Sequence, residues 1–319
     1  MTATWLLGVA GVLLLIAGPR LSSVTWLDSS PRLGIALWQA VCVSAVGVPV
    51  LLGLTLTVPA SAWVSDVGGL VDACARSIQA AYGVHGDALE PTLGLLLSTG
   101  LTGWTAGWVG WVGWRAHRAR TRMSDDLRLV STPGTEPGLR VLADDVPAAF
   151  CVPGRRAQVV ITSGALEVLT EPELRSVMAH ERAHLLARHH LATVLSQALA
   201  RAFPRVALFD TASRQTRRLI ELAADDSAAR RVDRVTVASA IVRMAAMRAP
   251  RAALAMAEGA EQHATTARVG RLLSPGPPPR AGHRGLAVAG VVGLLGAPLL
   301  LASSPVVLAT FTDLCVGVL

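Results

Sequence analysis

The sequence His-Glu-x-x-His occurs at His180, Glu181 and His184, in the polar middle of the chain. Residues four apart on a helix stand on one face, about 6 Å apart, so both imidazoles can reach one tetrahedral Zn²⁺. Glu181 sits beside that face, where its carboxylate can accept a proton from the water that the metal activates. The pattern is typical of zinc metallopeptidases. It predicts His180 and His184 as zinc ligands and Glu181 as the general base.

A catalytic zinc needs a third protein ligand and an open fourth position. Glu221 and Asp225 lie four residues apart in a later stretch with helical patterning, so they share one helix face. We expect Glu221 to be the third ligand and Asp225 to orient a ligating His through its other ring nitrogen. Two acidic residues at helical spacing among arginines are also typical of a solvent-exposed helix face that binds no metal. His189, His190 and Asp210 are alternative ligands. On a continuous helix, however, His189 would face about 140° away from the second His of the motif.

Helix and strand signals surround the motif. The segment 170–173, Thr-Glu-Pro-Glu, has the N-cap, proline and glutamate of a helix start. The apolar pattern predicts that this helix runs to about Pro204. Before it, four prolines interrupt any helix from Leu127 to Thr162, and residues 157–162 are typical of a strand. A small sheet should therefore precede the motif helix.

The composition indicates a membrane protein. The 319 residues are 52% hydrophobic and 16% charged, with a mean hydropathy of +0.48, which is too apolar for an ordinary soluble enzyme. A helix crosses a bilayer with about 20 residues. Four stretches have this length or come close to it: Thr4 to Gly18, Gly34 to Pro59, Thr92 to Trp114, and Gly285 to Thr310. The predicted fold is a mostly α integral membrane protein with four transmembrane helices.

Arginine placement predicts the orientation, because basic residues near span ends favour the cytoplasmic side. Four arginines follow Trp114 within eight residues, whereas the segment 61–90 holds one arginine and four acidic residues. We expect residues 1–114 to form three spans with an outer loop at 60–91, residues 115–284 to form a cytoplasmic catalytic domain, and residues 285–319 to form a fourth span and a short outer tail. Both termini would lie outside the plasma membrane. Cys74 and Cys315 would share that oxidising side and be available to pair.

Every one of the 29 basic residues is arginine, which excludes lysine Schiff bases, P-loop lysines and Ser-x-x-Lys acylation sites. The pI is near 10.7, but the arginines cluster beside apolar spans and no nucleic-acid reader motif is present, so direct nucleic-acid binding is not expected. The only tyrosine, Tyr82, falls in the predicted outer loop. The candidates for stabilising an oxyanion are therefore Arg182, Arg188, Arg217, Arg218 and His189.

Several stretches carry a family resemblance: residues 149–154, the strand ending in Ile161-Thr162, residues 166–169, Glu173-Leu174, residues 180–184, and Glu221 with Ala224-Asp225. With the long apolar flanks, they resemble the BlaR/MecR-type antirepressor membrane metallopeptidases and, more distantly, the HtpX-type membrane zinc endopeptidases. The resemblance implies a gluzincin-like α+β zincin domain with Zn²⁺ as cofactor. It gives the same roles to the motif residues, with Glu221 as third ligand and Asp225 as its neighbour.

The BlaR/MecR resemblance further implies a protease that cleaves itself and then acts on a cytoplasmic winged-helix transcriptional repressor. Full receptors of that family carry a penicillin-binding sensor domain after the last span, whereas the residues 311–319 alone follow here. Sensing would then fall to the segment 61–90 or to a membrane sensor partner. Two alternatives are an HtpX-like quality-control protease and a non-catalytic membrane signalling module in which the zinc motif is vestigial or structural.

Overall fold

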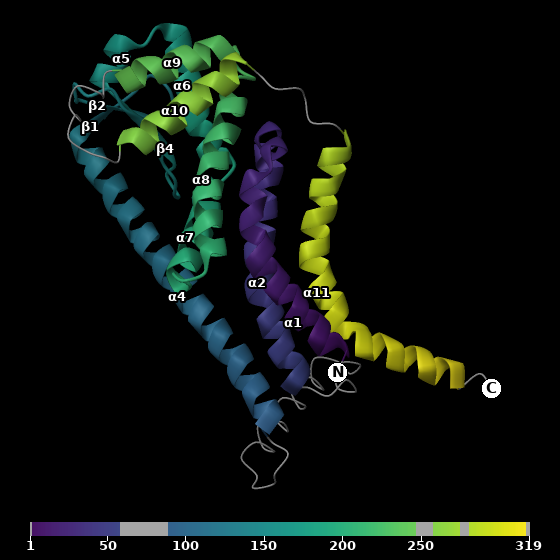
Figure 1. Ribbon diagram of the computed structural model, residues 1–319. Coiled ribbons are helices and arrows are strands. Elements are labelled where there is room, and N and C mark those ends of the chain that lie inside the picture. The colour runs from purple at the N-terminus through teal and green to yellow at the C-terminus, as the bar shows by residue number, and fades with distance from the viewer. Residues whose placement is uncertain (1, 58–88, 247–257, 275–280, 317–319) are drawn as a thin grey trace.

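The computed structural model describes residues 2–57, 89–246, 258–274 and 281–316, and helices make up most of them. Long helices form the lower part of the molecule in Figure 1, and shorter helices with a small sheet form the upper part. Cys74 lies outside the described residues, as does the side chain of Cys315. A mostly helical fold with a small sheet is as the sequence predicts.

The long helices are α1 (Thr2–Ala17), α2 (Pro31–Thr57), α4 (Leu89–Val130) and α11 (Ala281–Val316). Among the described residues, three stretches are long and apolar enough to cross a membrane: Thr4–Ser23, Pro31–Thr57 and Gly282–Ser303. The remaining predicted span, Thr92 to Trp114, lies within α4 but is not one of the three, and it is rich in glycine, threonine and tryptophan. The count of four spans stays a prediction.

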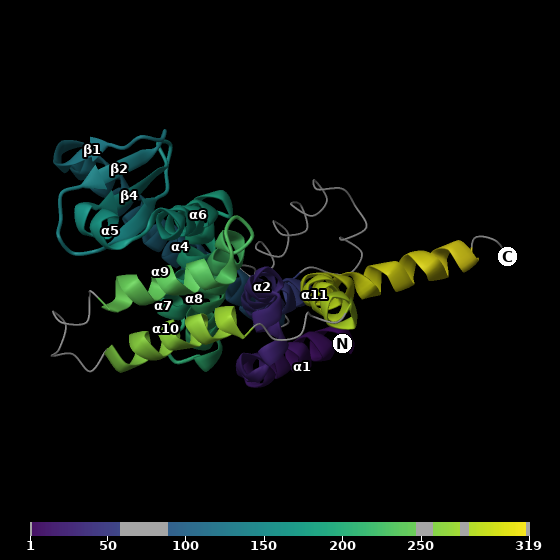
Figure 2. The ribbon, with the colours of Figure 1, turned by 90° about the horizontal axis from the view of Figure 1, so that it is seen from above.

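Helix α2 is the centre of the long-helix bundle. Figure 2 shows it in contact with α1 on one side and near α11 on another. Ser44 Oγ donates to Leu294 O of α11 at 2.6 Å, and Ser98 Oγ of α4 donates to Val50 O at 2.9 Å. Hydroxyl hydrogen bonds of this kind join helices where water is excluded.

The sheet has four strands: β1 (Ser131–Pro133), β2 (Leu139–Leu142), β3 (Ala149–Val152) and β4 (Gln158–Thr162). Their order is β1-β2-β4-β3, with β2 parallel to β4 and the other pairs antiparallel. Strand β4 is buried along its whole length and lies between β2 and β3 inside the sheet. Thr162 then caps α5 (Ser163–Val168) by accepting from Ala165 N at 3.2 Å.

Five further helices follow: α6 (Glu171–Leu186), α7 (His189–Ala202), α8 (Ala207–Ala228), α9 (Arg234–Ala246) and α10 (Glu258–Leu273). The predicted start of α6 is confirmed, since Thr170 and Glu173 form a capping box. The predicted continuation to Pro204 is wrong. The chain turns at Arg188, whose φ of 50° is left-handed, and α7 begins in a new direction. No glycine or proline marks this turn, so the apolar pattern did not reveal it.

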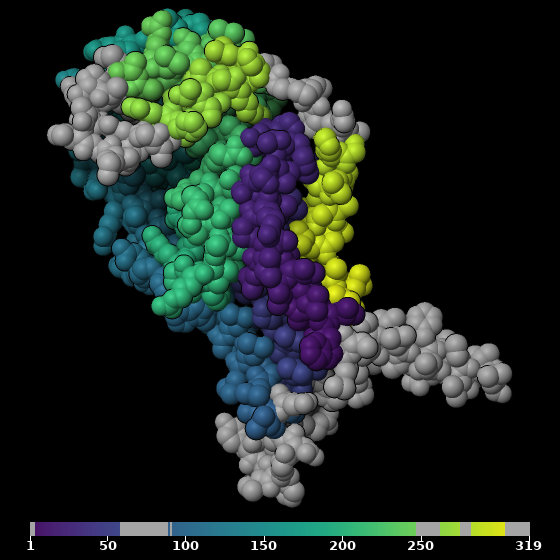
Figure 3. All heavy atoms as spheres, viewed as in Figure 1, coloured from purple at the N-terminus to yellow at the C-terminus, as the bar shows by residue number. Residues whose placement is uncertain are grey.

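The α7–α8 hairpin packs along the long helices instead of standing apart from them, as the touching spheres of Figure 3 show for α8 and the N-terminal helices. Trp38, Val41 and Cys42 of α2 form one buried cluster with Leu208 and Phe209 of α8. On the other side, the Trp104 indole of α4 donates to Ala202 O at the end of α7 at 3.0 Å. The predicted boundary between residues 114 and 115 falls inside the continuous helix α4 and stays a prediction.

Candidate metal centre

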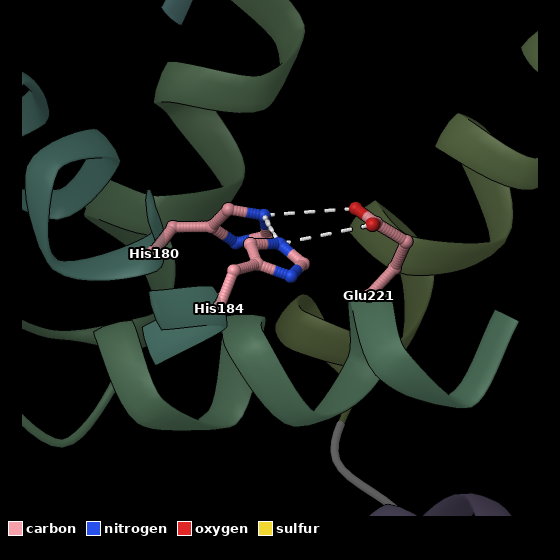
Figure 4. A group of neighbouring side chains, drawn as sticks. All are labelled: His180, His184 and Glu221. Carbon is pink, nitrogen blue, oxygen red and sulfur yellow. Dashed lines mark hydrogen bonds and ion pairs between the residues drawn. The ribbon is translucent and has the colours of Figure 1, made fainter. Parts of the chain in front are cut away.

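Helices α6 and α8 bring three side chains together (Figure 4). His180 and His184 lie one turn apart on α6, and Glu221 points toward them from α8. One ligand atom of each lies within 4.8 Å of the other two. The two Nε2 atoms are 3.0 Å apart, and the Glu221 oxygens lie 3.6 and 3.8 Å from them. Asp210, considered as a ligand from the sequence, instead pairs with Arg214 on its own helix.

These distances suit a tetrahedral metal ion. Bonds of about 2.0 to 2.1 Å to zinc place neighbouring ligand atoms roughly 3.3 Å apart, close to the spacings among His180, His184 and Glu221. The donor set of two imidazole nitrogens and one carboxylate is also that of catalytic zinc sites that leave one position open. The residues present therefore fit the metal that the motif predicts.

The Asp225 carboxylate contacts His180 at Nδ1, the ring nitrogen that is not near Glu221. The Asp225 side chain is 1% exposed, and its Oδ1 lies 3.0 Å from His180 Nδ1. Because this contact occupies Nδ1, it leaves Nε2 directed toward Glu221. The orienting role of Asp225 stays a prediction, and this contact supports it.

Arg268 of α10 completes this support, and sequence reasoning missed it. Its guanidinium donates to both oxygens of Asp225, at 2.8 and 2.7 Å, and its Nη1 lies 3.1 Å from Glu221 Oε2. A buried carboxylate is tolerated when it is paired in this way. No spacing rule could have singled out one arginine among 29 on a separate helix.

Charges and burial shift the pKa values of the side chains in this centre. Burial raises the pKa of Glu221, but the His180 hydrogen bond and the Arg268 charge outweigh it and lower the value to about 2. Burial acts to lower the pKa of His180, yet its hydrogen bonds to Asp225 and Glu221 raise it to about 9. Burial and the charge on His180 lower the pKa of His184 to about 4. At neutral pH the carboxylates are ionised, and His180 carries a proton that metal binding would displace.

Glu181 adjoins the centre on the side of β3. Burial raises its pKa, while the charge on His180 and a hydrogen bond with the Cys151 thiol act in the opposite direction. A carboxylate with a raised pKa is a better proton acceptor near neutral pH than an ordinary exposed one. Burial also raises the pKa of Cys151 to about 12, so this residue stays a neutral thiol.

His189 contacts the centre although the sequence predicted that it faces away. Its Nδ1 lies 3.0 Å from His184 Nδ1. The prediction failed because it assumed one continuous helix, whereas α6 ends at Leu186 and the turn at Arg188 brings His189 back. His189 therefore contacts Nδ1 of His184 as Asp225 contacts Nδ1 of His180. His189 is not part of the group of three ligand residues.

The centre opens into a cavity of about 2160 Å³, which His184, Glu221 and Cys151 line at one end. Its arginines outnumber its acidic residues, and they are Arg120, Arg214, Arg217, Arg218, Arg234, Arg268 and Arg271. Among the oxyanion candidates from the sequence, Arg217, Arg218 and His189 line this cavity. Arg182 pairs with Glu136 and does not line it. A cavity of this size can accept an extended peptide segment.

The loop between α1 and α2 also reaches the centre's supporting helices. The Asp28 carboxylate accepts from Arg218 of α8 at 2.8 and 2.5 Å. Arg271 of α10 donates to Asp28 O at 2.8 Å and pairs with Asp226 at 2.8 Å. Asp226 directly follows the residue that holds His180, so a few polar contacts connect the membrane-helix loop with the centre.

Comparisons with known proteins agree with this chemistry. Residues 114–281 match the profile of Peptidase family M48. A protein named protease HtpX homolog from Methylibium petroleiphilum is 42% identical over 76 residues, and the proteins of the same name from Burkholderia multivorans and Paraburkholderia phytofirmans are 40% identical over 76 residues. Each alignment covers 23% of this chain and 26% of the relative, so the match spans about a quarter of the relatives' length. No solved structure matches the chain.

Proposed function

The chain belongs to peptidase family M48, and on this basis we propose that it is a membrane-bound zinc metalloendopeptidase. The observation that carries the proposal is the convergence of His180, His184 and Glu221, whose ligand atoms lie within 4.8 Å of one another. The apolar helices, three of them long enough to span a bilayer among the described residues, support attachment to the membrane.

In this proposal His180, His184 and Glu221 hold Zn²⁺. Bound there, the ion supplies a Lewis acid that activates water and polarises the scissile carbonyl. Glu181 accepts the proton of the attacking water and passes it to the leaving amine. Asp225 and Arg268 keep His180 in the tautomer and orientation that ligation needs. The peptide would occupy the large cavity that Glu221 borders.

The arginine distribution supports a plasma-membrane location with the metal centre on the cytoplasmic side. Helix α4 carries Arg115, Arg118, Arg120 and Arg122 just after the apolar part, on the way to the sheet. With the four predicted spans, both termini lie outside. The division at residues 114/115 and 284/285 belongs to the same proposal.

The two proteolytic functions expected from the sequence, a signalling protease and a quality-control protease, differ in their range of substrates. The relatives named protease HtpX homolog favour an HtpX-like enzyme that degrades damaged membrane proteins. Nothing in the described residues favours self-cleavage, a winged-helix repressor or a membrane sensor partner over that reading, so these stay predictions. We therefore propose a broad specificity.

A cleavage assay on unrelated substrates tests this choice. The full chain, purified in detergent with zinc, should cleave several unfolded proteins, such as casein and reduced lactalbumin, at many sites, because a large open cavity selects weakly among peptides. Peptide mapping by mass spectrometry gives the sites. Cleavage confined to the chain itself and one co-expressed repressor would replace the broad reading with the signalling one. A zinc-loaded protein that cleaves nothing would favour the non-catalytic module.

A further inference from the structure

A second, smaller cavity lies behind the metal-ligand helix. Its volume is about 520 Å³, and Ala179, Arg182 and Ala183 of α6 line it together with His189. The other charged residues that line it are Arg32, Arg230 and Arg231, and no carboxylate is among its described lining residues.

Two of these arginines converge on one neutral oxygen. Arg32 Nη2 donates to Ser227 Oγ at 3.2 Å, and Arg230 Nη2 donates to the same oxygen at 2.9 Å. The Ser227 hydroxyl donates in turn to Ala223 O at 2.9 Å. One small hydroxyl is thus the shared acceptor for two like charges, one from the start of α2 and one from the turn that follows α8.

The positive charge of the arginines that line this cavity is largely uncompensated. Arg182 pairs with Glu136, but within the described ranges Arg32, Arg230 and Arg231 have no carboxylate at ion-pair distance. Each guanidinium carries five N–H donors, of which a single serine oxygen uses few. Planar guanidinium groups bind phosphate oxygens with paired, charge-assisted hydrogen bonds. A phosphoryl group would both use the spare donors and offset the repulsion between Arg32 and Arg230.

The cavity lies at an end of a candidate membrane span. Arg32 is the second residue of α2, whose apolar stretch runs from Pro31 to Thr57. Arg230 and Arg231 directly follow the end of α8, which packs beside α2 (Figure 1). Basic pockets between membrane helices at the cytoplasmic side bind the headgroups of anionic lipids.

We propose that Arg32, Arg230 and Arg231 form a binding site for a phosphoryl group, and that the phosphodiester of an anionic phospholipid occupies it. The group would join the start of α2 to the end of α8, the helix that carries Glu221. The three arginines are not among the grouped ligand residues of the metal centre, and we assign them no part in peptide hydrolysis.

Lipid retention by the purified full chain tests the proposal. Native mass spectrometry after exposure to equal amounts of phosphatidylglycerol and phosphatidylcholine should show preferential retention of phosphatidylglycerol. The double variant Arg230→Gln with Arg231→Gln should weaken that retention by about tenfold or more, as expected when ionic hydrogen bonds are lost. The matched control, Arg155→Gln with Arg156→Gln in the exposed β3–β4 turn, removes the same charge and should retain the lipid normally.

Two further arms make the outcome decisive. Arg32→Gln in α2 should also weaken retention of phosphatidylglycerol. This single variant tests the site if the double variant does not fold. Sodium phosphate is compared with sodium chloride at equal ionic strength: displacement of phosphatidylglycerol by phosphate alone supports the site and identifies free phosphate as a competing ligand. Equal retention of both lipids by the wild type, or equal losses in the Arg230/Arg231 and Arg155/Arg156 variants, would overturn the proposal.

Discussion

Glu181→Gln should lower the rate of peptide cleavage by about 10² to 10⁴ while leaving the zinc content unchanged. The amide keeps the size and shape of the carboxylate but cannot accept the proton of the attacking water. Glu181 is not one of the three grouped ligand residues, so its loss separates catalysis from metal binding. Zinc content by plasma mass spectrometry and casein cleavage are measured on the same preparation.

The matched control is Glu171→Gln in the first turn of the same helix. Glu171 is exposed and pairs with Arg175 one turn away, so this variant makes the same chemical change away from the grouped ligand atoms. It should cleave at the wild-type rate. If Glu181→Gln cleaves as fast as Glu171→Gln, Glu181 is not the base.

Glu221→Ala should release most of the zinc and abolish cleavage, because it removes one of the three protein ligands of the proposed zinc site. Loss of a partner that only supports a ligand already costs about 10- to 100-fold in metal affinity, and loss of the ligand itself should cost more. Titration with a zinc-buffering chelator measures the affinity of the purified variant. His184→Ala should behave in the same way.

Glu167→Ala on α5 is the control for this substitution, since Glu167 is an exposed glutamate outside the group of ligand atoms. It should bind zinc as tightly as the wild type. Should Glu221→Ala keep full zinc affinity, the third ligand is another residue, and His189 is the next to substitute because it already contacts His184.

The geometry of the centre was accessible to sequence reasoning because it depends on helical spacing. His180 and His184 share a face at any tertiary arrangement of α6, and the same rule places Glu221 and Asp225 on one face of α8. The start of α6 and the buried strand β4 also follow from local signals, namely the capping residues Thr170 and Glu173 and the strand-forming run 158–162.

What sequence reasoning missed depends on contacts between distant segments. Arg268 reaches Asp225 only because α10 packs onto the upper helices, and a periodic pattern carries no information on that packing. The turn at Arg188 is a left-handed residue without glycine, a conformation that tertiary contacts must stabilise. The insertion of the α7–α8 hairpin between α2 and α4 likewise rests on Trp38 and Trp104, whose partners lie more than ninety positions away.

Removal and restoration of zinc tests the central claim most directly. The wild-type chain, purified in detergent, should contain about one zinc per chain, the content of a mononuclear site with three protein ligands. It should lose casein cleavage when a chelator removes the metal, and it should regain cleavage when one equivalent of Zn²⁺ is returned. Cleavage that persists in metal-free protein, or a chain that binds no zinc at neutral pH, would contradict the account.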